Sequence, residues 1–140
     1  MTHSPLAANQ AFYAALAEGD AAAMDGLWSQ RQPVACIHPG WPVLAGREAV
    51  MKSWASILRD PPRIAVEATR VLDYGDTAVV LCIEKIGDNR LAATNVFSRE
   101  PDGWRLVHHQ AGRHHPLTDV RRPPAPALSI AGSRAPGSCR

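Results

Sequence analysis

The chain has 140 residues, of which 46% are hydrophobic and 20% charged, a balance that suits one globular domain with a buried core. It has neither a run of about 18 apolar residues nor a basic start followed by an apolar segment, so we expect no membrane span and no secretory signal. The formal net charge of +2 comes from the Arg-rich residues 117–140, and the nearly neutral remainder has no basic stripe, which excludes a nucleic-acid surface.

Three helices are predicted in the first part of the chain. Residues 12–17 place their apolar side chains on one helical face, and Gly19 directly after them is a favourable helix stop. Asp20 is a favourable N-cap for a second, short helix. A third helix carries an apolar stripe and ends before an Asp-Pro-Pro sequence. The predicted helical segments are 12–17, 23–28 and 47–58.

After the third helix the pattern becomes that of strands. Runs of strand-forming residues are separated by short segments rich in Asp, Gly, Asn and Pro, which is strong turn chemistry. Consecutive strands joined by such short loops are antiparallel. The fold class is therefore α+β, with three N-terminal helices packed on a curved, mainly antiparallel sheet. The predicted strands are 34–37, 64–72, 77–86, 91–99 and 104–110.

Residues 116–140 differ in kind from residues 1–115. Five prolines punctuate Ala, Ser, Gly and Arg, and the apolar surface is too small to offset an ordering cost of about 1–2 kcal/mol per residue. We therefore expect one domain at residues 1–115 and a flexible Pro- and Arg-rich tail at residues 116–140, which could become ordered on a partner subunit.

The cysteines suggest a reduced protein. Cys36, Cys82 and Cys139 are odd in number, widely spaced and match no metal-binding motif. Cys36 and Cys82 lie in apolar strands and are expected as reduced core residues. A cytoplasmic location is therefore the default expectation. We expect no cofactor, because the chain has no Gly-rich nucleotide loop.

Alternation along the strands predicts which side chains share a face of the sheet. A tight turn at Gly87-Asp88 or Asp88-Asn89 places Asn95 on the same face as the alternate residues of the preceding strand. A four-residue loop at 100–103 places Asn95 opposite His108, and a shift of one residue would place His109 there instead. The other face is also apolar, so we expect a second copy of the chain to cover it, as a homodimer formed through the sheet.

The run Ile37-His38-Pro39-Gly40-Trp41 places an imidazole and an indole where a strand ends and the chain turns. His38 could act as a general base, because an unperturbed imidazole titrates near neutral pH; the alternative is that it caps the turn by hydrogen-bonding the backbone. Trp41, in a Pro- and Gly-rich loop, is the better candidate to stack on a ring-shaped ligand. Trp54, on a helical stripe, is either a pocket residue or part of the core.

Several polar strand residues are further candidates. Asn95 could donate its amide N–H to a ligand carbonyl or enolate; the alternative is that it satisfies buried backbone or His108. His108 is a second acid–base candidate, whereas His109 is expected at an interface. Glu84, at a strand end, is expected to be half-solvated. A zinc site from His38, Glu84 and His108 lacks the spacing of zinc motifs, so no metal is predicted.

Four segments carry a family resemblance through their order and spacing. They are Glu18-Gly19-Asp20, Ile37-His38-Pro39 followed by Gly46-Arg47-Glu48, Ala93-Thr94-Asn95-Val96-Phe97, and Asp102-Gly103-Trp104-Arg105-Leu106-Val107-His108-His109. Over roughly residues 6–115 the chain resembles the SnoaL-like (polyketide cyclase-like) branch of the nuclear transport factor 2-like superfamily. This resemblance implies a cone-shaped roll, in which a bent sheet encloses an apolar pocket and dimers form through the sheet.

The resemblance to the ketosteroid isomerase of that superfamily also implies site positions. The aspartate base of the isomerase corresponds to His38, and its neutral acid corresponds to Asn95, eight residues before Gly103. Its first-helix tyrosine corresponds to Phe12, with Tyr13 adjacent. The predicted catalytic residues are His38, Asn95 and His108, and the predicted ligand-binding residues are Phe12, Tyr13, Trp41, Trp54, Cys82, Glu84 and Phe97.

Two functions follow as hypotheses. The first is a small dimeric protein whose pocket binds a small hydrophobic or aromatic molecule, with cofactor-free isomerase, cyclase or dehydratase chemistry. The second is a non-catalytic dimerisation or partner-binding module, because the last strand, Val107-His108-His109-Gln110-Ala111-Gly112, also resembles the kinase association module of the superfamily. A shared fold does not decide between them.

Overall fold

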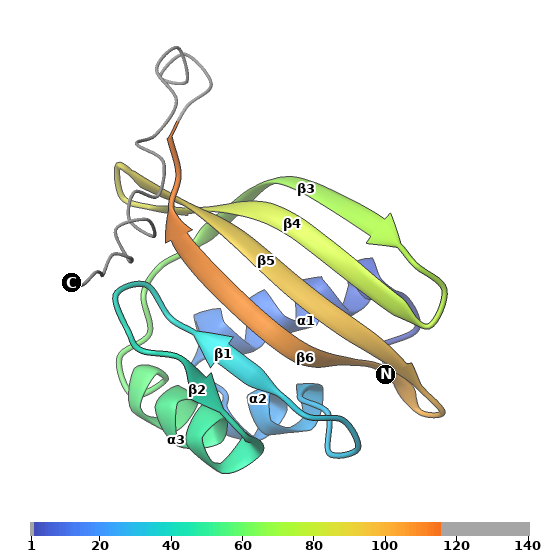
Figure 1. Ribbon diagram of the computed structural model, residues 1–140. Coiled ribbons are helices and arrows are strands. Elements are labelled where there is room, and N and C mark those ends of the chain that lie inside the picture. The colour runs from blue at the N-terminus through green and yellow to red at the C-terminus, as the bar shows by residue number, and fades with distance from the viewer. Residues whose placement is uncertain (1, 116–140) are drawn as a thin grey trace, which may run out of the picture.

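The computed structural model describes residues 2–115, and the predicted tail at residues 116–140 lies outside the described residues. Within residues 2–115, three helices pack against one mixed, curved and open sheet of six strands (Figure 1). The elements are α1 (Pro5–Glu18), α2 (Ala21–Leu27), β1 (Ala35–Ile37), β2 (Leu44–Ala45), α3 (Arg47–Ile57), β3 (Ala65–Asp73), β4 (Thr77–Ile86), β5 (Asn89–Glu100) and β6 (Gly103–Arg113). The strand order is β2-β1-β6-β5-β4-β3, and β1 runs parallel to β6. The predicted α+β fold class is confirmed.

The junction between α1 and α2 forms as the sequence predicts. Gly19 ends α1 in the left-handed conformation at φ 63°, and the Asp20 side chain caps α2 by accepting the backbone N–H of Ala23 at 3.0 Å. A Cβ atom at Gly19 would lie 2.9 Å from the carbonyl oxygen of Leu58. The end of α1 therefore approaches the end of α3 so closely that only glycine fits there.

The turn between β4 and β5 sets which residues face the helices. Ile86 pairs with Asn89, so the two loop residues are Gly87 and Asp88, one of the two predicted alternatives. Asn95 consequently pairs with Val80, and both are fully buried on the face that the helices cover. This part of the predicted strand register is confirmed.

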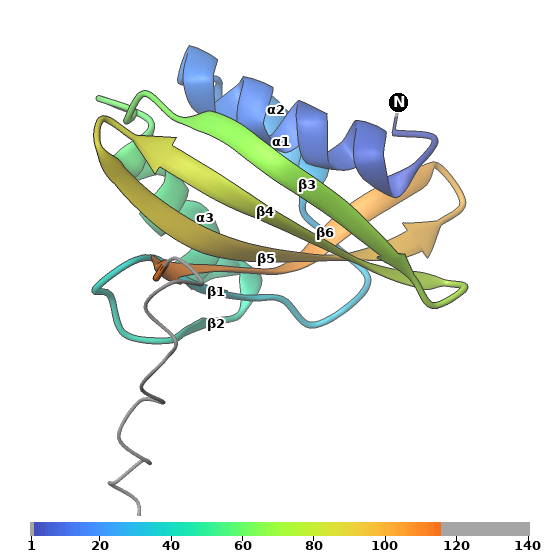
Figure 2. The same cartoon turned by 90° about the horizontal axis from the view of Figure 1, so that it is seen from above.

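A β-bulge in β6 changes the register of the last strand pair. Phe97 pairs with Leu106, whereas Val96 pairs with His108, so Val107 has no partner in the ladder. A second irregularity lies between Glu67 and Arg70 in β3. Bulges bend and twist the strands that contain them, in agreement with the curved β4, β5 and β6 seen from above in Figure 2.

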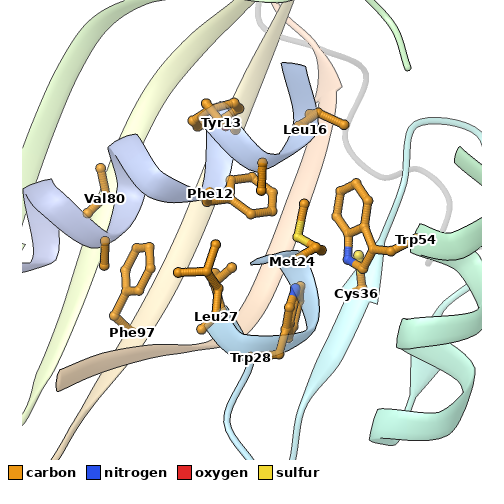
Figure 3. Packing of buried hydrophobic residues seen from close by; sticks show 14 of the residues in the cluster. Phe12, Tyr13, Leu16, Met24, Leu27, Trp28, Cys36, Trp54, Val80 and Phe97 are labelled. Atoms are coloured by element: carbon orange, nitrogen blue, oxygen red, sulfur yellow. The ribbon is translucent and has the colours of Figure 1, made fainter. Parts of the chain in front are cut away.

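The core fills the space between the helices and the sheet. Figure 3 shows Phe12 of α1 near the middle of the buried cluster, with Val80 and Phe97 on one side and Trp54 of α3 on the other. Cys36 on β1 and Cys82 on β4 are buried free thiols, as predicted. The core is thus continuous from β4 to α3.

The observed elements differ from the prediction mainly at their ends. The two-residue strand β2, which pairs with β1, was not predicted, because so short a segment shows no alternation. The β6 strand also continues past the predicted end at residue 110 to Arg113. No helix within residues 2–115 has the length and apolar character needed to cross a bilayer.

Candidate active site

A cavity of about 220 Å³ lies where the helices meet one end of the sheet. It is lined by α1, α3, the loop after β1, the segment between α3 and β3, and the strands β4, β5 and β6. Most of the lining is apolar, including Leu16, Trp41, Trp54, Ile57, Ile64 and Ile86. Three lining side chains can exchange protons, namely His38, Glu84 and His109. Each of the three is only 3% exposed.

His38 follows β1 directly and is held from α3. Its Nε2 lies 2.8 Å from Ser53 Oγ, and the Ser53 hydroxyl donates its proton to the backbone oxygen of Val50 at 2.7 Å. Because that hydroxyl has one proton, His38 Nε2 must donate and Nδ1 carries the lone pair. The Trp41 and Trp54 rings pack edge-on against the imidazole, with centroid distances of 4.8 and 4.7 Å. Burial lowers the pKa of His38 to about 4, so the ring is neutral at neutral pH.

His109, on β6, is held from the strand beside it. Its Nδ1 lies 2.5 Å from Asn95 Oδ1, and Asn95 Nδ2 donates to Asn9 Oδ1 at 2.8 Å and to the Tyr13 hydroxyl at 3.2 Å. An amide oxygen only accepts, so His109 Nδ1 carries the proton and Nε2 carries the lone pair. Burial, with smaller contributions from the two neighbouring histidines, lowers the pKa of His109 to about 3.

Glu84, on β4, is the third titratable group of the cavity. The Tyr13 hydroxyl donates to Glu84 Oε2 at 2.6 Å and lies 3.3 Å from the Cys82 sulfur. Burial raises the pKa of Glu84, and the hydrogen bond from Tyr13 partly opposes this. Burial and the nearby Glu84 raise the pKa of Tyr13, which therefore remains a neutral donor. The prediction of a half-solvated Glu84 is wrong, because its side chain points to the face covered by α1.

Asn95 does not face the cavity as an oxyanion donor. It is 0% exposed, and its amide nitrogen donates to Asn9 and Tyr13. Both N–H bonds are therefore used inside the protein. The predicted contact with a ligand carbonyl is wrong. The amide is buried and internally satisfied, but its partners are Asn9, Tyr13 and His109, not the backbone or His108 of the predicted alternative.

His108 lies on the opposite face of the sheet from the cavity. The bulge at Val107 inserts one residue, so Asn95 pairs with His109 and Val96 pairs with His108. The predicted role of His108 in the pocket is wrong for this reason, and His109 takes the position instead. A slip of one residue exchanges the faces of all following side chains.

The predicted ligand-binding residues occupy three different places. Trp41, Trp54 and Glu84 line the cavity, with Trp41 at its mouth, 41% exposed. Tyr13 and Cys82 lie behind Glu84 in the hydrogen-bonded network. Phe12 and Phe97 are fully buried core residues that do not reach the cavity, which corrects their predicted contact with a ligand.

Two polar residues of the site were not predicted from the sequence. Asn9 lies three and four residues before Phe12 and Tyr13, on the apolar face of α1, and is 2% exposed. Ser53 similarly lies between Val50 and Ile57 at helical spacing in α3. A polar side chain on a buried helical stripe must find a partner, and this was the available signal. The partners themselves come from distant parts of the chain.

The donor set of the site does not fit a metal ion. Within the described part of the chain, no three His, Cys, Asp or Glu side chains are placed to hold one. The two imidazoles are 6.3 Å apart between ring centroids, and each uses one nitrogen in a hydrogen bond to another side chain. The side chains of the site are joined by hydrogen bonds instead.

Known proteins share this fold along most of the chain. The family model described as SnoaL-like domain matches residues 6–112. A Streptomyces avermitilis protein, named as a candidate dehydratase of the NTF2-like family, is 36% identical with a TM-score of 0.71, and the match covers 78% of this chain and 92% of that chain.

Two further solved structures of this fold carry different functional names. A Thiobacillus denitrificans protein, named as a candidate association domain of calcium/calmodulin-dependent protein kinase type II, is 35% identical with a TM-score of 0.71, covering 82% of this chain and 98% of that chain. A Parabacteroides distasonis protein, named as a candidate ketosteroid isomerase, is 20% identical with a TM-score of 0.65, covering 81% and 89%, and shows the fold alone. No curated protein matches the chain.

Proposed function

The chain belongs to the SnoaL-like family of the NTF2-like superfamily, and on this premise we propose that it is a cofactor-free acid–base enzyme acting on a small apolar molecule. One observation carries the proposal: three buried titratable side chains, His38, Glu84 and His109, line one largely apolar cavity. Buried titratable groups in a cleft are common where protons are transferred. Dehydration, isomerisation and cyclisation are the candidate reactions, and the name of the 36%-identical relative favours dehydration.

The size of the cavity supports a substrate with one ring. A cavity of about 150 Å³ holds benzene, and sites for drug-sized ligands occupy about 300–1,000 Å³. The cavity of this protein, at about 220 Å³, lies between these values. The side chains of Trp41 and Trp54 supply apolar surface for the ring, and the lone pair of His109 Nε2 can accept a hydrogen bond from a hydroxyl group of the substrate.

His38 is the proposed general base. Its Nδ1 lone pair is available, apart from a long 3.8 Å contact with the Cys36 thiol, and the neutral form is favoured by burial. In a dehydration, this nitrogen would accept the proton from the carbon next to a carbonyl group. Ser53 holds the other nitrogen in its protonated form and thus orients the ring.

The test is turnover of a one-ring β-hydroxy ketone, the aldol of benzaldehyde and acetone. Dehydration yields benzalacetone, whose conjugation is followed by ultraviolet absorbance. We expect the protein to accelerate this reaction, and we expect His38→Gln to lower kcat by about 100-fold or more, because general-base catalysis contributes this much. His108→Gln is the matched control, since that imidazole lies on the other face. Equal turnover by His38→Gln and the wild type would refute the assignment of His38.

We also propose that the protein forms a homodimer through the face of the sheet opposite to the helices. The apolar side chains of this face are half-buried in the isolated chain, which is a common state for a surface that a second subunit covers. They include Val79, Leu81, Ile83, Val96 and Val107. The cavity lies on the other side of the sheet, so a dimer of this kind leaves it accessible.

The alternative function is a non-catalytic assembly module. Its support is the 35% identity to the Thiobacillus denitrificans protein, a match that covers 98% of that chain. Sedimentation velocity separates the two functions in part. A large ring would favour the assembly module, whereas a simple dimer that turns over the β-hydroxy ketone supports the enzyme.

A further inference from the structure

The proposed chemistry also needs a proton donor, and the two histidines of the site cannot supply one. His38 commits its N–H to Ser53, and His109 commits its N–H to Asn95. Each ring therefore presents a lone pair and no free proton. Among the titratable side chains that line the cavity within residues 2–115, Glu84 alone has the capacity to offer a proton.

Glu84 is buried without an opposite charge. The ion pairs of the described residues involve Asp25, Glu67, Asp76 and Asp102, and none reaches Glu84. An isolated carboxylate is costly in apolar surroundings, so the protonated form is favoured. Tyr13 engages only Oε2, which leaves Oε1 as the oxygen that can carry the proton.

The hydrogen bonds behind Glu84 all have the same direction. His109 Nδ1 donates to the Asn95 oxygen, the Asn95 amide nitrogen donates to the Tyr13 hydroxyl, and Tyr13 donates to Glu84. Such a chain polarises in one sense, so each donor strengthens the next. The direction favours negative charge at Glu84, the charge that the group acquires when it releases a proton.

We propose that Glu84 is the general acid of this site, and that Tyr13, Asn95 and His109 are positioning residues whose hydrogen bonds stabilise its carboxylate as it forms. This inference rests on the acid–base function proposed above and assigns the second half of the reaction. It also gives the substrate class: a one-ring β-hydroxy carbonyl compound whose hydroxyl group reaches Glu84.

The proton and electron balance of the dehydration is complete with these groups. His38 Nδ1 takes the proton from the carbon next to the carbonyl, and the electron pair of that C–H bond forms the C=C bond. The C–O bond breaks, its electron pair leaves with the oxygen, and that oxygen takes the Glu84 proton to depart as water. An imidazolium at His38 and a carboxylate at Glu84 remain, and transfer of one proton from the first to the second through solvent restores both.

The protonation of Glu84 is measured directly by carbon NMR of protein labelled at the glutamate side-chain carboxyl carbon. The expected result is one resonance at the position of a protonated carboxyl group at neutral pH, which disappears in Glu84→Gln. Glu67→Gln is the matched control, because Glu67 is exposed on the neighbouring strand and its replacement should leave the protonated resonance in place. Ionised resonances for every glutamate of the wild type at neutral pH would overturn the proposal.

Tyr13→Phe tests the positioning role. The hydrogen bond from Tyr13 lowers the pKa of Glu84, so its removal should raise the pH at which the Glu84 resonance titrates. Asn95→Ala should shift the titration in the same direction, and it serves if Tyr13→Phe fails to fold. The other titratable groups near the carboxyl are Cys82 on the same strand, Cys36 on β1 and the two cavity histidines, all uncharged at neutral pH. An unchanged titration in both variants would contradict the positioning role.

Kinetics with the benzaldehyde–acetone aldol then separates this inference from the proposed function. Glu84→Gln should lower kcat by about 100-fold or more, whereas Glu67→Gln should leave it unchanged. Absence of turnover by the wild type removes the proposed function and the acid role together. Turnover by a wild type whose Glu84 is ionised, or full activity of Glu84→Gln, overturns the acid role alone.

Discussion

At the scale of single residues, the cavity is defined by two neutral histidines with opposite tautomers. Ser53 fixes the proton of His38 on Nε2, and Asn95 fixes the proton of His109 on Nδ1. Both assignments follow from counting donors, because a hydroxyl already committed and an amide oxygen can only accept. The cavity therefore offers two lone pairs and one carboxyl group to a bound molecule.

These two histidines predict a loss of stability in mild acid. Burial lowers the pKa of His38 from 6.5 to about 4, so the unfolded chain binds more protons than the folded protein between those values. The contribution of His38 to the free energy of unfolding is complete above pH 6.5 and is lost as the pH falls toward about 4. The difference between the two pH values amounts to about 3 kcal/mol for this one residue. Urea unfolding across this pH range is the measurement.

The control for this prediction is His38→Gln, together with His109→Gln. Each variant should flatten the acid side of the stability profile, since glutamine does not titrate. Glu84, with its raised pKa, acts in the opposite direction: its contribution to stability is present at low pH and declines as the pH rises. A wild-type profile that is level from pH 6.5 down to about 4 would contradict the buried neutral state.

At the scale of elements, turn chemistry was the part of the fold that the sequence predicts best. The loop residues Gly87-Asp88 fixed the register of β4 and β5, and with it the position of Asn95. The bulge at Val107 was not predictable, because both faces of β6 are apolar enough that alternation does not reveal an inserted residue. That one insertion moved the site histidine from His108 to His109.

The hydrogen-bond network around Asn95 was likewise not predictable from the sequence. Helical spacing locates Asn9 and Tyr13 on the buried face of α1, yet their partners lie on β4 and β5, far along the chain. Local patterns report burial and the secondary-structure period, and they do not report which buried polar groups meet. The cavity residue His38 could be chosen in advance, because it ends a strand beside a Pro- and Gly-rich turn, whereas its partner Ser53 could not.

The contact between α1 and α3 gives a prediction at this scale. Gly19→Ala places a Cβ atom at a left-handed φ of 63° and within 2.9 Å of the Leu58 carbonyl oxygen. We expect a loss of about 1–3 kcal/mol in the free energy of unfolding, measured by urea denaturation. Gly26→Ala in α2 is the control, because a Cβ atom there meets nothing within 4 Å. Equal stability of Gly19→Ala and the wild type would show that the two helix ends can separate.

At the scale of the whole molecule, the sheet has two different uses. One face, with Val80 and Asn95, carries the core and the wall of the cavity, and the other carries half-buried aliphatic side chains. A shared fold does not select among the different functions named for its structural relatives. The three titratable groups of the cavity favour the enzyme over the assembly module.

The proposed dimer predicts that one charged side chain on the second face of the sheet prevents dimerisation. Leu81→Arg, in the middle of β4 on that face, should convert the dimer into a monomer in sedimentation velocity, because an unpaired charge in an apolar interface is costly. Tyr74→Arg is the control, since Tyr74 is 66% exposed in a turn. A dimer that persists in Leu81→Arg would place the interface elsewhere.

The role of His38 as general base is tested by the pH dependence of kcat/KM for the benzaldehyde–acetone aldol. This parameter reports the protonation of the free enzyme. If buried, neutral His38 is the base, activity is level through mild acid and falls only near pH 4. An acid limb at the ordinary histidine value of 6.5, or a limb that persists unchanged in His38→Gln, would contradict it.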